Sequence, residues 1–161
     1  MYQPKSNVQP SIFLLLLLLS VGAAACGDDA IVVGETTPDP DCDALLTPAD
    51  FQAVCGEAIT LSATGFEGIA LNPCNRDASG DEGILLVTRH PSASVAAQGA
   101  EVAGGRGPTA QAGLGLYASA GSAGIFTVEV KATDDPAAIC APEDLPELLD
   151  IALSRVLPEG S

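Results

Sequence analysis

The sequence predicts an α+β fold, in which an antiparallel β-sheet packs against helices on one face of a disulfide-stapled single domain. Two observations predict this class. Turn and cap signals divide residues 42–161 into the order helix, two strands, helix, two strands, helix, an order typical of α+β domains. The same region holds an even number of cysteines, which suits two disulfides in an oxidising compartment: Cys42, Cys55, Cys74 and Cys140.

The first predicted helix covers "TPADFQAVCG", residues 47–56. Thr47 can cap it, Pro48 suits its first turn and Gly56 can end it. Two strand-like stretches follow at residues 58–66 and 68–71. Residues 72–83 are rich in turn-forming side chains, so we expect a loop there that Cys74 pins.

The second half repeats the pattern. Residues 84–89 alternate as a strand does, and a helix is expected from Ser92 or Ser94 through Val102. After the Gly-rich break at 104–107, residues 113–118 and 125–132 predict a hairpin around "SAGSAG". In its second strand, the side chains that are expected to face the core are those of Phe126, Val128 and Val130. Those expected to point outward are Thr127, Glu129 and Lys131.

The last predicted helix has the clearest apolar stripe. Asp144 is expected to cap it, with Glu147 completing a capping box, and Arg155 complements the dipole near its end. The stripe consists of Leu145, Leu148, Leu149, Ala152 and Val156.

The first 25 residues predict a lipoprotein signal peptide. Lys5 supplies a positive start, and the apolar run at 12–25 is 14 residues long. As a helix that run reaches about 21 Å, short of the roughly 30 Å hydrocarbon core of a bilayer. Its end, "AAAC" at 23–26, resembles a bacterial lipobox, which implies a lipid on Cys26 and cleavage before it. The alternative is an ordinary secretory signal with a cysteine nearby.

Residues 26–41 are expected to form the lipidated cysteine and an acidic flexible tether, followed by the α+β domain at 42–161. Removing the 25 leader residues from the 161 leaves 136, with five basic and 21 acidic residues and a net charge of −16. This charge argues against nucleic acid or anionic lipid as a partner of the folded domain. Membrane attachment is therefore assigned to the lipid on Cys26.

The four remaining cysteines allow three pairings. We favour Cys42–Cys74 with Cys55–Cys140, closing loops that would each contribute about 4 kcal/mol in the chain-entropy model. The alternative of Cys42–Cys55 with Cys74–Cys140 requires the chain to double back along the first helix. A zinc site is disfavoured, because the sequence has no C-x-x-C pair and one histidine, His90.

"CDALLTPADFQAVCG", residues 42–56, resembles the opening of a family of small secreted lipoproteins of unknown function, known mainly from actinobacteria. "AGLGLYASAGSAGIFTVEV", residues 112–130, resembles that family's later hairpin. The resemblance places Cys74 at the family's second cysteine, which supports the Cys42–Cys74 pairing. Cys55 and Cys140 are additional to the family pattern, and the resemblance implies no catalytic residue.

No catalytic or metal constellation is complete, so we expect no cofactor, no metal site and no catalytic residue. Residues 39–50 place acids at calcium-loop spacing, but Ala44 stands where that loop needs glycine. Residues 75–86 fail similarly, because Leu86 occupies the last ligand position. His90 precedes Pro91, and no G-x-S-x-G elbow accompanies it.

These observations predict a non-catalytic binding or interaction module, held on the cell membrane or outer membrane and facing the periplasm or exterior. Its expected partner is an envelope protein or a neutral ligand. Two alternatives remain open: a hydrolase that uses carboxylates or His90, and a structural envelope spacer.

Overall fold

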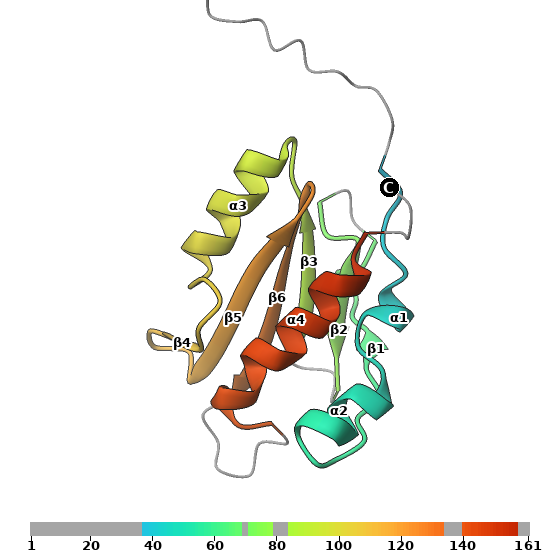
Figure 1. Cartoon of the computed structure of the whole chain (residues 1–161), viewed down its shortest axis with the longest axis vertical. Helices are drawn as coiled ribbons and strands as arrows, with labels where there is room; N and C mark the ends of the chain where they lie inside the picture. Colours follow the sequence, from blue (N-terminus) through green and yellow to red (C-terminus); the bar gives the residue numbers. More distant parts are fainter. Residues whose placement is uncertain (1–36, 69–70, 79–83, 134–139, 158–161) are drawn as a thin grey trace, which may run out of the picture. The chain divides into compact units, whose positions relative to one another are not determined.

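One antiparallel sheet of six strands, in the order β1-β2-β3-β6-β5-β4, lies at the centre of the fold (Figure 1). The computed structural model describes residues 37–68, 71–78, 84–133 and 140–157, all of which belong to one unit that begins at Thr37. The strands are β1 (Ser62–Ala63), β2 (Cys74–Asp77), β3 (Leu85–Arg89), β4 (Thr109–Gln111), β5 (Leu116–Ala123) and β6 (Phe126–Thr133). The helices are α1 (Cys42–Leu45), α2 (Pro48–Val54), α3 (Ala93–Val102), the 3-10 turn η1 (Pro142–Asp144) and α4 (Leu145–Arg155).

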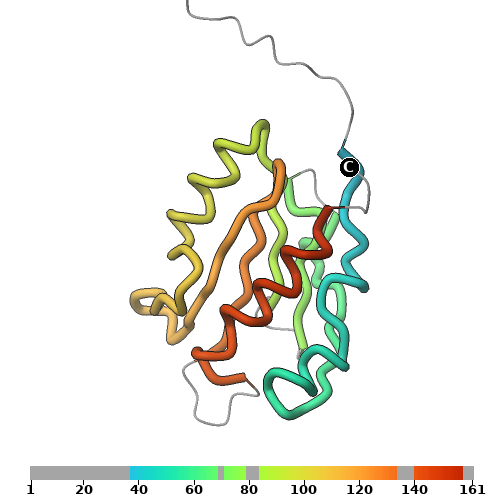
Figure 2. The backbone as a smooth tube through the Cα atoms, viewed as in Figure 1, coloured from blue at the N-terminus to red at the C-terminus, as the bar shows by residue number. Residues whose placement is uncertain are grey.

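Helix α4 lies diagonally across one face of the sheet, with α1 and α2 beside it (Figure 2). We call this the covered face. Strands β3 and β6 pair Leu85 with Val130 and Val87 with Val128, and all four side chains are buried there. The apolar stripe predicted for the last helix packs on them, since all five of its members are buried, Leu145, Leu148, Leu149, Ala152 and Val156.

Helix α3 packs on the other face. The hydroxyl of Thr127 donates to the carbonyl of Ala96 at 2.9 Å, and Thr127 lies between two residues of the covered face. Because successive strand residues point to opposite faces, α3 and α4 lie on opposite sides of the sheet. Gly99 permits this approach, since a Cβ there would sit 3.0 Å from the Thr127 hydroxyl.

The predicted fold class is confirmed: the described residues form an α+β domain with an antiparallel sheet, packed helices and two disulfides. The expectation that the helices share one face holds for α1, α2 and α4, whereas α3 occupies the other. The expectation that Thr127 points to solvent is wrong, because α3 buries it. Periodicity alone does not reveal a helix on the second face.

Cap signals located the helices well. Thr47 and Asp50 form the capping box of α2, and the Ser92 hydroxyl caps α3. The capping box expected at Asp144 is wrong, because its carboxylate accepts from the backbone N–H of Ala141 at 3.0 Å and orders η1 instead. The short α1, capped by Asp41, was not expected.

The strand predictions were less accurate. The expected strand at 58–66 contains only the two residues of β1, and the expected loop at 72–83 contains β2. Strand β5 runs through most of "SAGSAG" to Ala123, so the hairpin turn is tighter than predicted. Glycine at position 121 lets α4 pack closely on this strand, since a Cβ there would lie 2.6 Å from Leu153 Cδ1.

Both favoured disulfides are confirmed. Cys42 bonds to Cys74, joining α1 to β2, and Cys55 bonds to Cys140, joining the end of α2 to the residues before η1. The predicted signal peptide and Cys26 lie outside the described residues. Within the described ranges, no helix is both long and apolar enough to cross a membrane.

Candidate functional site

A pocket of about 240 Å³ opens on the face of the sheet opposite α4. It spans β2, β3, β6 and β5, where the register pairs Asn75 with Leu86 and Leu116 with Thr133. Its lining consists of Asn75, Ile84, Leu86, Leu116, Lys131, Ala132 and Thr133. Helix α3 packs on β5 and β6 further along this face, near Thr127, which leaves the pocket end open.

The lining combines an aliphatic surface with a few polar groups. Ile84, Leu86 and Leu116 supply the aliphatic part, and the Asn75 amide and Thr133 hydroxyl can donate or accept hydrogen bonds. This composition is typical of small-molecule sites, in which few polar groups orient a ligand against an apolar wall.

The charge of the pocket is compensated from within the sheet. Lys131 Nζ lies 3.3 Å from Glu129 Oε2, and their side chains are only 27% and 18% exposed. An ammonium offers three donors, so Lys131 retains donors for a ligand while its charge is balanced. The pocket therefore fits a neutral ligand that presents a hydrogen-bond acceptor.

The pocket lies at the end of the sheet away from the first described residue. Strand β6 runs from Phe126, which pairs with Arg89, to Thr133, which pairs with Leu116. The Arg89 guanidinium donates to the carbonyl of Thr37 at 2.7 Å. Thr37 thus lies at the Phe126 end, while Leu116 and Thr133 line the pocket at the opposite end.

His90 has a structural position. Its Nε2 lies 2.9 Å from the Thr127 hydroxyl, whose single proton is directed to the carbonyl of Ala96. The hydroxyl can then only accept from His90, so Nε2 carries the proton of that bond. This arrangement leaves Nε2 with no lone pair for a nucleophile and fixes β6 to α3.

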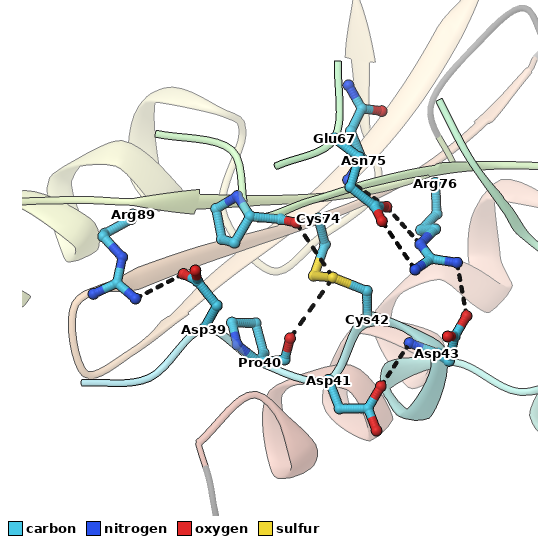
Figure 3. Close-up of a disulfide and its surroundings, with 11 residues drawn as sticks. Asp39, Pro40, Asp41, Cys42, Asp43, Glu67, Cys74, Asn75, Arg76 and Arg89 are labelled. Carbon is cyan, nitrogen blue, oxygen red and sulfur yellow. Dashed lines mark hydrogen bonds and ion pairs between the residues drawn. A yellow bond between two sulfur atoms is a disulfide. The ribbon is translucent and has the colours of Figure 1, made fainter. Parts of the chain in front are cut away.

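The acids at calcium-loop spacing bind different partners. Asp39 pairs with Arg89, and Asp43 with Arg76, each at 2.7 Å (Figure 3). The Asp41 carboxylate accepts from the backbone N–H of Asp43. Because these side chains bind separate partners, they do not form a cation site. Among the residues that the structure describes, no group of three or more His, Cys, Asp or Glu side chains could hold a metal.

Asp50 and Arg155 form a bidentate ion pair. Two guanidinium nitrogens donate to the two carboxylate oxygens at 2.6 and 2.9 Å, and Nη1 also donates to the carbonyl of Leu45. The hydrogen bonds from Arg155 hold the pKa of Asp50 well below its ordinary value, against burial, which raises it. The same pairing raises the pKa of Arg155. This pair ties α4 to α2.

Every basic side chain in the described ranges is engaged in an ion pair, namely Arg76, Arg89, Arg106, Lys131 and Arg155. Acidic residues outnumber them, so the surface presents uncompensated negative charge only. Binding of polyanions through this surface is unfavourable.

No family model, characterised protein or solved structure matches this chain. The pocket was not anticipated from the sequence, because its lining comes from four strands, one of which, β2, was predicted as a loop. One signal was available: Lys131 and Glu129 alternate with buried residues of β6, and they were expected to point away from the core.

Proposed function

We propose that this chain is a bacterial envelope lipoprotein, anchored in a membrane through lipid on Cys26. Its domain is a non-catalytic binding module that takes a neutral, partly aliphatic ligand in the pocket. The observation that carries the proposal is the lining of the pocket, in which aliphatic side chains surround a charge-compensated lysine.

The position of the pocket supports this function. It lies at the end of the sheet away from Thr37, the residue through which the chain continues toward Cys26. A domain tethered at its Phe126 end can present the pocket away from the membrane. Both disulfides suit the oxidising compartment that the signal peptide implies.

The geometry around His90 gives Nε2, one of its two ring nitrogens, a structural role. A hydrolase that used His90 would need its imidazole to accept a proton from a nucleophile or water. The bond to Thr127 instead uses Nε2 as a donor within the packing of α3. His90→Ala should therefore lower stability and leave ligand binding in the pocket unchanged.

The binding proposal is tested with three probes of equal chain length and different charge: hexanamide, hexanoate and hexylammonium. Backbone NMR shifts are followed in the full chain. We expect hexanamide to give the largest shifts, concentrated in β3 and β6 around Leu86 and Lys131. Leu86→Ser should weaken binding, whereas the matched control Leu114→Ser, outside the pocket, should not. Shifts spread over the surface, or shifts from either charged probe as large as those from hexanamide, would contradict the proposal.

The anchor is tested separately by expressing the full-length chain and its Cys26→Ser variant in a bacterium. The parent should partition into detergent and carry acyl mass on Cys26, while the variant should carry none. Equal partitioning of both forms, with no acyl mass on the parent, would exclude the lipid anchor.

A further inference from the structure

An exposed apolar loop lies next to the point where the chain enters the domain. The backbone N–H of Arg89 donates to the carbonyl of Leu71 at 2.8 Å, and the guanidinium of the same residue donates to the carbonyl of Thr37 at 2.7 Å. Thr37 and Leu71 therefore flank one arginine. We call the end of the domain formed by Thr37, Phe66, Leu71 and Arg89 the entry end.

Phe66 and Leu71 are both largely solvent-exposed, at 68% and 64%. Hydrogen bonds hold Phe66 in this region: Thr64 N donates to Asn75 O, and Phe66 N donates to the Thr64 hydroxyl. Exposed aromatic and aliphatic side chains on one loop are costly in water and mark a contact surface.

The reach of the preceding chain limits what this surface can meet. Thr37 is 11 residues after Cys26, a distance of at most about 40 Å in any conformation. The domain extends from the entry end along β6, whose 8 residues span about 27 Å. The entry end is thus the part of the domain nearest, along the chain, to any lipid on Cys26.

Both arginines near the entry end are paired with carboxylates. Glu67 lies 2.6 Å from Arg76 Nε, and Asp39 lies 2.7 Å from Arg89 Nη2. Arg89 in turn sits over the ring of Phe126, 4.8 Å from its centroid. Arg76 also pairs with the exposed Asp43, so this end keeps a negative charge, and zwitterionic rather than anionic lipid is the surface that it can meet.

We propose that Phe66 and Leu71 insert into the interface of the membrane that holds the chain, so that the domain rests on the lipid with its entry end and directs the pocket outward. This proposal rests on the lipid anchor at Cys26. Phenyl and aliphatic side chains next to compensated charges suit the boundary between headgroups and acyl chains.

The sequence contains no tryptophan, which permits a direct test. Full-length chains with Phe66→Trp, Leu71→Trp or Leu114→Trp are reconstituted into zwitterionic vesicles containing brominated phosphatidylcholine. Leu114 is a matched control, because it is 65% exposed and lies in the turn between β4 and β5, at the pocket end. Bromine should quench the emission of Phe66→Trp and Leu71→Trp about twofold or more and shift it to the blue, as expected for an interfacial indole, and should leave Leu114→Trp unquenched.

Intact mass measured on the same vesicles separates the two proposals. Acyl mass with equal, weak quenching at all three positions would overturn the interfacial contact and leave the anchor standing. Absence of acyl mass would overturn the anchor, and the contact would fall with it. Quenching of Leu114→Trp alone would show that the domain lies in the reverse orientation, which also excludes the proposal.

Discussion

The two faces of the sheet differ in what they contribute. On the covered face, β3 and β6 present mainly apolar side chains, of which Leu85, Val87, Phe126, Val128 and Val130 are buried. Arg89 is the charged exception, and it lies over the ring of Phe126. On the opposite face the same strands present Leu86, Thr127, Glu129 and Lys131, and α3 covers only part of it. Most of the burial that stabilises the domain therefore lies on one face, and the other is available for a pocket.

This division explains how a small domain holds an open site. Both disulfides tie helical segments to the covered face or to one another, since Cys74 pairs with Val87 in the sheet and Cys140 precedes η1. The partly open face contributes fewer buried apolar atoms and tolerates polar side chains there. Substitutions on the two faces should consequently have unequal effects on stability.

Removal of the disulfides should have the largest effect. In the chain-entropy model, Cys42→Ser with Cys74→Ser and Cys55→Ser with Cys140→Ser should each lower the free energy of unfolding by about 4 kcal/mol. The second pair closes the longer loop, with 85 residues of separation against 32, so its loss should cost about 1 kcal/mol more. Urea unfolding measures both. A larger loss for the shorter loop would contradict the entropic account.

The second prediction compares neighbouring leucines on β3 that point to opposite faces. Leu85→Ala should cost about 3–4 kcal/mol, because Leu85 is fully buried beneath the helices and its removal leaves a cavity. Leu86→Ala should cost about 1 kcal/mol, because Leu86 lines the open pocket and is only partly buried. Chemical denaturation of both variants gives the difference directly. Equal losses would mean that the second face carries as much of the stability as the first.

The same division accounts for what the sequence could predict. Alternation identified β3 and the inward residues of β6, because burial on one face leaves a strict period of two. Cap residues such as Thr47 and Ser92 identified helix starts, because they act through contacts a few residues away. These features are local, so the sequence expresses them directly.

Features that depend on distant partners were missed. Strand β2 contains Asn75 and Asp77, whose residue types are typical of turns, but Cys74 and the ion pairs of Arg76 hold this segment beside β3. Thr127 looked solvent-facing because its partner Ala96 lies 31 residues earlier. The pocket depends on the placement of β2 beside β3, which is why the fold class was predictable and the candidate site was not.

The third prediction concerns how acid affects the ion pair between Asp50 of α2 and Arg155 of α4. Arg155 holds the pKa of Asp50 below its ordinary value, so the pair stabilises the folded state above about pH 4 and loses this contribution as the pH falls further. Asp50→Asn should cost about 1–2 kcal/mol at pH 7, through the lost ion pair and weakened cap. The difference in the free energy of unfolding between variant and parent, measured by urea titration, should narrow steadily below about pH 4.

Asp43→Asn is the matched control for this prediction. Asp43 also pairs with an arginine, but its side chain is 81% exposed, against 14% for Asp50. An exposed pair contributes about 0–1 kcal/mol, so this variant should stay near the parent at every pH. If the free energy of unfolding depended on pH in the same way in both variants, the buried Asp50–Arg155 pair would contribute no more to stability than an exposed pair.

The smallest expected effect comes from two buried hydroxyls on opposite faces of the hairpin. Ser119 pairs with Val130 on the covered face and is fully buried, and its hydroxyl has no hydrogen-bond partner among the described residues. Thr127, on the other face, bonds both His90 and Ala96. Ser119→Ala removes an unsatisfied polar group and should stabilise the protein by about 0.5–1 kcal/mol, whereas Thr127→Val should destabilise it by about 1–2 kcal/mol. Thermal unfolding of both variants measures the two effects. A loss of stability in Ser119→Ala would mean that this hydroxyl has a hydrogen-bond partner, such as a bound water. The covered face would then contain water between its buried side chains.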